Sequence, residues 1–426
     1  MTRSRLAGFH RLSLGERHCA LAAATDLAPA DVAALGTAAL PLDVADAMVE
    51  NAVGVFALPL AVALNFRVNG RDRVIPLVVE EPSVVAAASS AALLAREGGG
   101  FLADADAGAM IGQIQLVDVV DPGAAMDRVR AARARLLAAA RTLTPGLCRR
   151  GGGPRDLEVR LLHAPDGSPM LVVHVFVDTG DAMGANAVNS LLEQLAPSVE
   201  EVAGGRACLR ILSNLADRRL ARAAVHLPVE ALARDGREGA AVAARVVRAC
   251  DLAVVDPYRA ATHNKGVMNG IDAVALATGN DWRAIEAGAH AFACRDGAYR
   301  SLTAWRVVDG TLVGSIELPL AVSVVGPLVQ VHPQVRRVLE LLGVASAREL
   351  AAIMAAVGLA SNLAALRALV TDGIQTGHMR LHARSVAHAA GARGALAEEV
   401  QRRLVAGGEV KLDRARALVR AIATGE

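Results

Sequence analysis

Two consecutive segments decide the fold: Met110–Val120, MIGQIQLVDVV, and residues 122–141, PGAAMDRVRAARARLLAAAR. The first alternates apolar and polar residues, which is typical of a strand with one buried face. The second has helical spacing and begins with a proline, which suits the first turn of a helix. Downstream, 157–178 predicts two strands around the turn signal Pro165–Ser168, followed by a helix and a last strand. The order β-α-β-β-α-β predicts a ferredoxin-like unit.

This unit, residues 109–215, interrupts a larger region made of 1–108 and 216–373. Helices with alanine-rich faces are expected there at 82–96, 229–250, 282–291, 347–356 and 360–370. Residues 374–426 form a run of short amphipathic segments separated by glycines, which predicts a small C-terminal flap. We therefore expect an α+β protein with a large, mainly helical domain, an inserted ferredoxin-like domain and a helical flap.

The composition excludes several classes of protein. Hydrophobic residues make up 53% and charged residues 21%, and the net charge is only +2, so there is no footprint for nucleic acid or an anionic membrane. The five cysteines contain no CxxC pair, which argues against a zinc site or a disulfide framework. Prolines break the longest uncharged stretch, 318–335, and the N-terminus lacks a signal-peptide pattern. We expect a soluble, cytoplasmic protein without a bound metal.

One lysine draws attention because almost all the positively charged residues of the chain are arginines. Only Lys265 and Lys411 are lysines among the 45 cations. A small ammonium at a developing oxyanion would resist replacement by arginine, whereas chance survival explains an exposed lysine such as Lys411. Asparagines, aspartates and glycines crowd the segment around Lys265, 259–282, which favours a site built on loops.

Three further segments carry weaker signals. Glu80 and Glu81 precede Pro82 and an apolar helix, so they are expected at a helix N-terminus. Residues 181–189, DAMGANAVN, lead from a strand into a helix whose N–H groups suit a phosphate. His378 and His382 lie four residues apart without an HExxH pattern, so surface or core histidines and a proton donor on a mobile element are the alternatives, and a zinc pair is not expected.

These segments occur together in one known family. The chain resembles the soluble bacterial (class II) 3-hydroxy-3-methylglutaryl-coenzyme A (HMG-CoA) reductases over nearly its whole length. The matching motifs include VEEPSVVAAAS, DAMGANAVN, RILSNLADRRLARA, DPYRAATHNKGVMNGIDAVALATGNDWRAIEAGAHAFA, VGLASNLAALRAL and GIQTGHM.

The resemblance implies a role for each motif. Lys265 would stabilise the oxyanion formed at the thioester carbonyl, and Asp281 would keep that lysine charged. Glu81 would donate a proton at the aldehyde stage, and His378 would protonate the departing coenzyme A thiolate. Substrate contacts are implied for Ser83, Arg259 and Asn269. Contacts with the nicotinamide cofactor are implied for Asp181, Ala182, Met183, Gly184, Ala185 and Asn186.

The chain departs from the family pattern at some positions. Ser323 and Pro327 replace usual glycines, Ser361 replaces a common glutamine and Ser90 a frequent tyrosine. The acid that NAD-using members place ahead of the glycine triplet is here Thr144. Overall resemblance favours NAD(H), which is our expectation, whereas the arginines at 141, 149, 150 and 155 would suit the 2′-phosphate of NADP(H).

The resemblance implies interconversion of HMG-CoA with mevalonate and coenzyme A by two hydride transfers, in either direction. It also implies a homodimer or a multiple of dimers, and the apolar run at 50–66 would cover a partner. Two alternatives stay open: an inactive paralogue that binds acyl-coenzyme A, and a reductase of a different branched acyl-coenzyme A.

Overall fold

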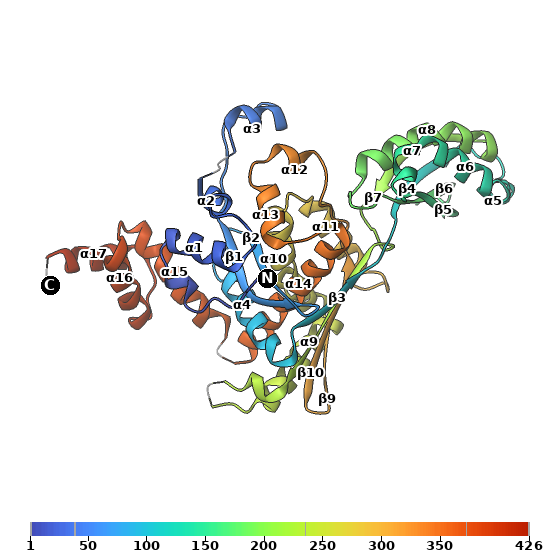
Figure 1. Cartoon of the computed structure of the whole chain (residues 1–426). Helices are drawn as coiled ribbons and strands as arrows, with labels where there is room; N and C mark the ends of the chain where they lie inside the picture. The colour runs from blue at the N-terminus through green and yellow to red at the C-terminus, as the bar shows by residue number, and fades with distance from the viewer. Residues whose placement is uncertain (1, 38–39, 235, 372, 425–426) are drawn as a thin grey trace.

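The computed structural model describes residues 2–37, 40–234, 236–371 and 373–424, without the side chains of 374–381 and 423–424. The chain forms two β-sheets, each with its own hydrophobic core. The helices at the C-terminus share a third, smaller core (Figure 1). This mixed α and β architecture confirms the expected fold class. We propose the division into three domains at 108/109, 215/216 and 373/374 on the basis of these separate cores.

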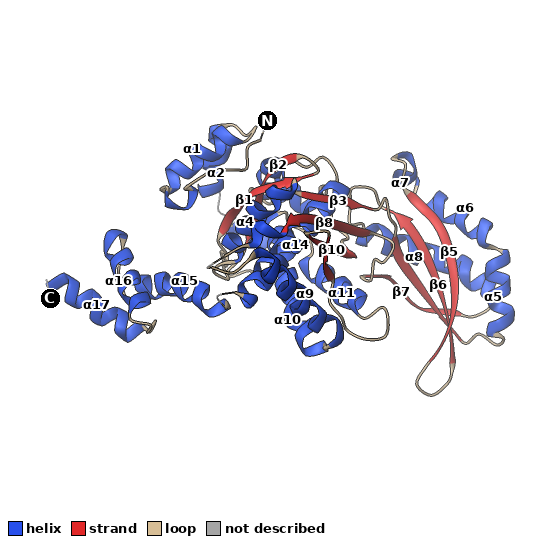
Figure 2. Cartoon of the chain, turned by 90° about the horizontal axis from the view of Figure 1, so that it is seen from below, coloured by secondary structure: helices blue, strands red, loops and turns tan. Residues whose placement is uncertain are grey.

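The smaller sheet has the order β5-β6-β4-β7, and every neighbouring pair is antiparallel. Helices pack on one of its faces, as Figure 2 shows. The elements are β4 (Met110–Val117), α5 (Pro122–Ala131), α6 (Arg133–Leu143), α7 (Pro145–Arg149), β5 (Gly153–His163), β6 (Pro169–Asp178), α8 (Ala185–Ala203) and β7 (Arg206–Ser213). The predicted β-α-β-β-α-β order is confirmed, except that the first helix breaks at Ala132.

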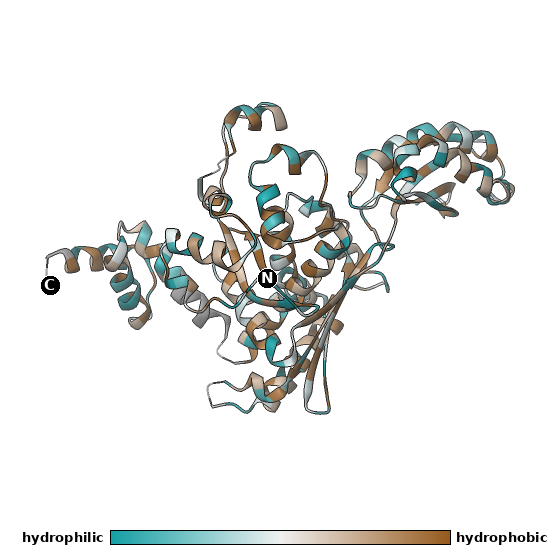
Figure 3. Ribbon diagram, viewed as in Figure 1, coloured by the Kyte–Doolittle hydropathy of each residue, from teal (hydrophilic) through white to brown (hydrophobic). Residues whose placement is uncertain are grey.

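The larger sheet was not predicted from the sequence. Its order is β2-β1-β3-β8-β10-β9, and only β1 and β3 are parallel neighbours. Its strands are β1 (Leu60–Val68), β2 (Arg71–Val78), β3 (Phe101–Ala105), β8 (Leu220–Pro228), β9 (Thr303–Val308) and β10 (Thr311–Pro319). β2 is buried at five consecutive residues, so it lacks the period-two pattern that marks a strand in a sequence. In Figure 3 these central strands are mainly brown, the colour of hydrophobic residues.

Helices around this sheet carry the functional segments. They are α4 (Val84–Ala95), α9 (Gly239–Val255), α10 (Pro257–Ala277), α11 (Trp282–Ala293), α12 (Pro327–Val331), α13 (Val335–Leu342) and α14 (Ala347–Val370), with short 3-10 turns at Arg96–Gly98 and Val229–Leu232. The helix expected at 229–250 was wrong in its start, because a turn and a loop precede α9. The two helices expected at 347–356 and 360–370 are one.

α14 is the central helix of the larger core. It is long and apolar enough to cross a membrane by composition alone, yet most of it is buried against other elements of the chain. Gly358 allows this packing, since a Cβ there would lie 2.8 Å from the side chain of Ile271 on α10. The burial identifies α14 as a core helix and explains why no break occurs at its glycine.

The two ends of the chain add small helical clusters. The N-terminal elements are a 3-10 turn (Phe9–Arg11), α1 (Leu14–Ala24), α2 (Pro29–Thr37) and α3 (Leu42–Met48), of which α1 and α2 pack against β1 and β2. The C-terminal elements are α15 (Ile374–Ala389), α16 (Gly394–Ala406) and α17 (Leu412–Thr424), which share a core of their own. In Figure 1 these last helices project away from the larger sheet. The glycine-separated helices predicted from 374 onward are confirmed.

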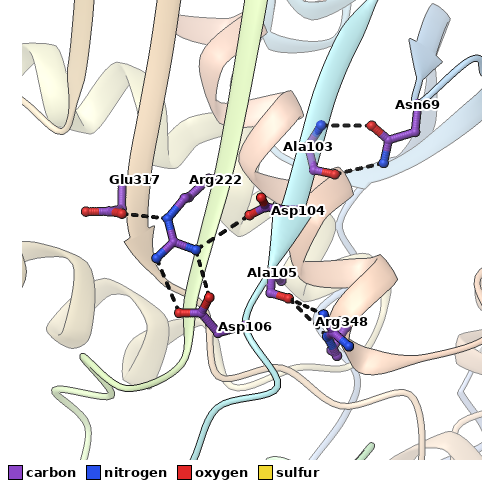
Figure 4. A network of polar contacts seen from close by, with 8 residues as sticks. All are labelled: Asn69, Ala103, Asp104, Ala105, Asp106, Arg222, Glu317 and Arg348. Atoms are coloured by element: carbon purple, nitrogen blue, oxygen red, sulfur yellow. Dashed lines mark hydrogen bonds and ion pairs between the residues drawn. The ribbon is translucent and has the colours of Figure 1, made fainter.

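A polar network joins the ends of the central strands of the larger sheet next to the inserted unit (Figure 4). The Arg222 guanidinium on β8 donates to Asp106 at 2.8 Å and to Glu317 on β10 at 2.7 Å, and Asp104 lies 3.5 Å away. Arg348, in the first turn of α14, donates twice to the Ala105 carbonyl. The network therefore ties β3, β8, β10 and α14 together where the chain leaves for the inserted unit.

Candidate active site

Lys265 lies in the middle of a continuous helix, so the expectation of a site on loops was wrong. Asp256 begins α10 by accepting hydrogen bonds from the N–H groups of Tyr258 and Arg259 at 3.3 and 3.1 Å. Gly270 serves packing rather than flexibility, because a Cβ there would lie 2.3 Å from Ser361 Oγ on α14. The helix therefore presents its polar residues from a rigid element.

A short ion pair joins α10 to the start of α4. The Lys265 ammonium donates to Glu81 Oε2 at 2.5 Å, and Asn269, one turn further along α10, donates to the same oxygen at 3.5 Å. α4 begins at Val84 rather than at Pro82, since Ser83 has the left-handed φ of 81° and forms the N-cap. A positive φ at a serine two residues after Glu81 is backbone strain of the kind found at functional sites.

These residues line one cavity of about 730 Å³. Its wall contains Glu81, Ser83, Arg259, Lys265 and Asn269, which are five of the residues expected to contact the substrate or react with it. Ser90 and Ser361, noted in the sequence as departures from the family pattern, also line it. Sequence reasoning missed its other polar residues: His10, Arg234, Thr262, His263, Asn362, Arg367, Arg384 and Gln401. Apart from the carboxylate of Glu81, the charged side chains of this wall are all cations, so the cavity suits a polyanionic ligand although the whole chain is nearly neutral.

A second cavity of about 870 Å³ adjoins the first and shares His10, Ser83, Ser90 and Arg384 with it. It lies between the N-terminal helices, β1 and α4, and it adds Arg5, Arg17 and His18 to many apolar side chains. The small Ser90 side chain belongs to the shared wall. Together the cavities form a long, largely apolar channel with cations along it, and Lys265 stands at one part of its wall.

A buried polar network supports the floor of the first cavity. His263 Nε2 lies 2.7 Å from Thr303 Oγ1 and 2.9 Å from both Ser301 Oγ and Asn362 Nδ2. Asn362 Oδ1 accepts from Trp305 and Thr303 at 2.8 and 3.0 Å. Burial, aided by the charge of Arg259, lowers the pKa of His263 to about 4, so this histidine is neutral near pH 7. The network holds α10, α14 and β9 together directly beneath Lys265.

Asp281 lies apart from the lysine in the single chain. It is the N-cap of α11, its carboxylate accepts from the Ala284 N–H at 3.1 Å, and it is exposed. Within the described part of the chain it makes no hydrogen bond or ion pair with Lys265 or Glu81. Its expected partnership with Lys265 stays a prediction.

The segment Asp181–Asn186 enters α8 and contacts the large domain. The Asp181 carboxylate accepts from the Ala347 N–H at 2.8 Å at the start of α14, and its carbonyl accepts from Ser323 Oγ and Val324 N. Ser323, one of the departures from the family pattern, therefore anchors this segment. The carboxylate of Asp181 is occupied by this contact. The N–H groups without a side-chain partner lie a few residues later, in the first turn of α8.

The start of α8 fits a phosphate group. Gly184 is its N-cap with φ of 89°, and no side chain caps the N–H groups of the first turn, which contains Ala185 and Asn186. A Cβ on Gly184 would lie 2.3 Å from Thr179 Cγ2. Thr179 is itself held by the buried Arg219, whose guanidinium donates to Thr179 Oγ1 and to the Ala182 and Val322 carbonyls. These contacts hold the turn before α8 in place, and the N–H groups of the first turn of α8 have no side-chain acceptor among the described residues.

Around the glycine triplet 151–153 the arginines divide into two pairs. Arg155 is bound to Asp178 at 2.8 Å, and Arg141 donates to the Pro154 carbonyl. Arg149 and Arg150, at the end of α7, are exposed and make no side-chain hydrogen bond or ion pair within the described residues. Thr144 bonds only to its own helix turn and to Cys148. Two unengaged cations thus lie immediately before the glycine triplet.

His378 belongs to α15, but its side chain lies outside the described residues. His382, one turn later, is exposed. Two residues beyond it, Arg384 lines both cavities, so α15 does reach the channel. No group of three or more histidine, cysteine or acidic side chains suited to a metal ion occurs among the residues described.

The fold and the site define a class of protein, the nicotinamide-dependent oxidoreductases that act on an acyl-coenzyme A. The family model of hydroxymethylglutaryl-coenzyme A reductase matches residues 13–383. The chain belongs to this family.

Individual relatives agree with this assignment. The chain is 47% identical over 414 residues to the 3-hydroxy-3-methylglutaryl-coenzyme A reductase of Archaeoglobus fulgidus, covering 97% of this chain and 93% of the relative. A probable HMG-CoA reductase of Borreliella burgdorferi is 34% identical over 80% of this chain and 78% of its own. The HMG-CoA reductase structure from Streptococcus pneumoniae superimposes with a TM-score of 0.84 at 42% identity, over 98% of this chain and 99% of that one. A class II enzyme from the same organism, solved with NADPH in open conformations, gives 0.82 at 44% identity, over 86% and 99%.

Proposed function

We propose that the protein interconverts HMG-CoA and mevalonate plus coenzyme A, and that Lys265, Glu81, Asp281 and His378 do the chemistry. The observation that carries this proposal is the Lys265–Glu81 pair in a cation-rich cavity of about 730 Å³. Reduction of a thioester to an alcohol needs an electrophilic group at the carbonyl oxygen and acids for the thiolate and the alkoxide. In this proposal Lys265 is the electrophilic group at the carbonyl oxygen, and Glu81 is the acid for the alkoxide.

The nicotinamide, when bound, supplies a hydride to the carbonyl carbon in each of two successive reductions. Lys265 Nζ donates to the oxygen that becomes negative as the carbon is reduced. When the resulting hemithioacetal collapses, the C–S bond breaks, the C=O bond re-forms, and His378 gives a proton to the departing sulfur. In the second reduction the aldehyde oxygen takes its proton from Glu81. Lys265 and Asn269 both contact the Glu81 carboxylate, so the three side chains would surround that oxygen.

The channel suits the rest of the substrate. Arg259 and Asn269 stand beside Lys265 and are placed to hold the carboxylate and hydroxyl of the hydroxymethylglutaryl group. The apolar second cavity, with Arg5, Arg17, His18 and Arg384 along it, suits a pantetheine arm and its phosphates. The orphaned, buried Ser361 Oγ marks a position where a substrate polar group would find a partner.

The cofactor binds, in this proposal, at the N-terminus of α8 through the N–H groups after Gly184. NADH stays the expectation from overall resemblance. Arg149 and Arg150 favour NADPH as the alternative, because exposed guanidiniums without partners would pair with a 2′-phosphate. Measuring kcat/KM with both cofactors, in the parent and in an R149Q/R150Q variant, decides between them: a loss confined to NADPH would identify these arginines as the phosphate site.

We infer that the active unit is a homodimer whose sites are shared between subunits. Asp281 contacts neither Lys265 nor Glu81 in one chain, so the second copy would supply it. The run at 50–66 exposes Val53 and Phe56 at 99% and 91%, which is unusual for large apolar residues and suits a covered surface. Light scattering that finds a fully active monomer would contradict this inference.

The test of the function is absorbance at 340 nm with HMG-CoA and reduced nicotinamide, and with mevalonate, coenzyme A and oxidised nicotinamide. Turnover in both assays is expected, because one set of acids and bases serves both directions. Binding of HMG-CoA without turnover would favour the inactive paralogue, and turnover of another branched acyl-coenzyme A alone would favour the third alternative. We propose a cytoplasmic location, where the cell's acyl-coenzyme A pool lies.

A further inference from the structure

The loop after β10 lies between two turns that the proposed reaction needs. One is the turn before α8, whose following N–H groups would bind the cofactor, and the other is the turn before α11, which ends at Asp281. Val324 N donates to the Asp181 carbonyl at 3.1 Å, so the loop contacts the first turn directly. Residues 320–324 are therefore placed to join the cofactor site to Asp281.

A buried arginine fixes the first turn to this loop. The Arg219 guanidinium is 7% exposed and donates to the Gly180 and Ala182 carbonyls at 3.3 and 3.0 Å. It also donates to Thr179 Oγ1 at 3.2 Å and to the Val322 carbonyl at 2.9 Å. Its hydrogen-bond acceptors within the described residues include no carboxylate, so this guanidinium orders backbone rather than neutralising an acid.

The side chain of Asn280 fixes the second turn to the same loop. Its Oδ1 accepts from the Ser323 N–H at 2.7 Å, and its Nδ2 donates to the Ser323 carbonyl at 3.1 Å. Nδ2 also donates to Thr278 Oγ1 at 3.0 Å, and Thr278 is buried at the end of α10. Pairing with a backbone N–H and a backbone carbonyl at once requires an acceptor and a donor, which an amide has and a carboxylate does not.

Asn280 precedes Asp281 directly, and the turn that holds both is packed from behind. Gly279 has a left-handed φ of 67°, and a Cβ there would lie 2.9 Å from Leu328 Cδ2 of α12 and 3.1 Å from Val335 Cγ2 of α13. The turn therefore has little room to move away from the loop. A displacement of the loop at Ser323 would be carried through the Asn280 amide to Asp281.

We propose that Asn280 is a positioning residue that aligns Asp281 and couples its alignment to cofactor binding at the turn before α8. The coupling runs through residues 322–324 and Arg219. The inference rests on the proposed function, because Asp281 and the cofactor are the groups that Asn280 joins. A phosphate bound at the first turn of α8 would hold the turn, the loop and Asp281 in one arrangement.

A second asparagine provides a matched control. Asn69 pairs with the backbone of Ala103 in the same two-way manner, since its Nδ2 donates at 2.8 Å and its Oδ1 accepts at 2.9 Å (Figure 4). It is exposed and lies on the turn between β1 and β2. Asn280→Ala and Asn69→Ala therefore remove equivalent pairs of hydrogen bonds, and only the first of them belongs to the link.

The kinetic test compares these two variants with the wild type. Asn280→Ala should lower kcat by about ten- to a hundredfold, because a small misplacement of a reacting group is costly, and KM for HMG-CoA should stay unchanged. Asn69→Ala should keep the wild-type kcat even where its Tm falls. The Tm of each variant, measured without substrate, shows how much stability the lost hydrogen bonds contributed.

Trp282 gives a readout that does not depend on turnover. It follows Asp281 directly and is 42% exposed, whereas Trp305, the second of the two tryptophans, is 4% exposed. Adding NAD⁺ or NADP⁺ should change the tryptophan emission of the wild type, and Trp282→Phe should abolish this change. In Asn280→Ala the change should be largely lost although calorimetry still detects cofactor binding, and in Asn69→Ala it should persist.

The outcomes separate this inference from the proposed function. A kcat of Asn280→Ala no lower than that of Asn69→Ala would overturn the positioning role. An emission change that persists in full in Asn280→Ala, or a wild type that binds cofactor without any change, would overturn the coupling. A wild type that binds cofactor but lacks turnover in both directions would refute the proposed function alone, because the emission of Trp282 tests the coupling by itself. A wild type that binds neither cofactor would refute both.

Discussion

At the scale of single residues, the identity of the cation at position 265 matters more than its charge. The ammonium sits 2.5 Å from Glu81 Oε2 and within reach of Asn269, on a rigid helix. A guanidinium is planar and larger, and it presents several donors in a fixed fork. It cannot occupy this position without displacing the carboxylate or the carbonyl oxygen of the substrate.

Lys265→Arg should therefore lower turnover by about 10²–10³-fold, which is the typical cost of losing one oxyanion donor. The fold and the affinity for coenzyme A should be largely preserved. Steady-state kinetics of the variant checks this, with Lys411→Arg as the control: Lys411 pairs with the exposed Glu409, and its replacement should not change turnover. A Lys265→Arg enzyme within a few-fold of the wild type would mean that the lysine survived by chance.

His263 gives a prediction at acid pH. Burial lowers its pKa from 6.5 to about 4. Between pH 6.5 and 4, therefore, the unfolded chain binds a proton at His263 and the folded chain does not. The stability that His263 contributes is thus present above about pH 6.5 and is lost as the pH falls to 4, and the loss amounts to about 3 kcal/mol. Urea unfolding of His263→Gln should show a shallower decline from pH 6.5 to 4 than the wild type. Parallel declines would show that His263 is not the group responsible.

The sequence identified the reacting residues better than their setting. Lys265 was singled out by the bias toward arginine, and Glu81 and Arg259 came from motifs. His263, Asn362 and Arg384 were missed, because a buried histidine, an asparagine in an alanine-rich helix and an arginine among many arginines carry no periodic signal. Only the packing of α10, α14 and α15 around one cavity brings them together.

At the scale of elements, pattern strength decided which predictions succeeded. β4 and β5 alternate between buried and more exposed residues over much of their length, and β6, although buried at seven consecutive residues, follows a turn signal; all three were predicted. In the larger sheet, β2 is buried at five consecutive residues and reads as a continuous apolar run. β3 and β8 do alternate in burial, but they were not predicted. Glycines misled in the opposite sense: Gly266 and Gly270 suggested a loop, yet both lie within α10, and Gly270 allows α10 and α14 to pack closely.

The junction between β6 and α8 allows a matched test with two glycines. Gly184 and Gly180 both have left-handed φ, 89° and 61°, but a Cβ on Gly184 would lie 2.3 Å from Thr179 Cγ2, whereas a Cβ on Gly180 meets nothing within 4 Å. Gly184→Ala should shift the first N–H groups of α8 and raise KM for the nicotinamide cofactor about tenfold or more, with KM for HMG-CoA unchanged. Gly180→Ala should change KM for the cofactor by no more than a few-fold. Equal effects of the two substitutions would remove the phosphate role from this turn.

At the scale of the whole molecule, the site is assembled from parts with separate cores. The lysine and glutamate belong to the larger core, the open helix N-terminus to the inserted unit, and α15 to the C-terminal helices. Such a division suits a reaction that must exchange its cofactor between two reductions while keeping the aldehyde. The sequence revealed the three parts because their patterns differ, but their spatial relation depends on contacts such as Asp181 with Ala347 that no local pattern encodes.

The last prediction concerns α15, the C-terminal helix that carries His378 and that places Arg384 in the wall of both cavities. If His378 protonates the thiolate, it is needed only when a C–S bond breaks. His378→Gln should therefore reduce turnover of HMG-CoA by about 10²-fold or more, within the range of general acid catalysis. Reduction of free mevaldehyde, which expels no thiolate, should stay within a few-fold of the wild type.

His382→Gln is the matched control, because His382 lies one turn away on the same helix and is exposed. It should leave both substrates nearly unaffected. Equal losses on HMG-CoA and mevaldehyde in His378→Gln would indicate that α15 acts by closing over the channel rather than by giving a proton. A larger loss in His382→Gln would assign the proton to the other histidine.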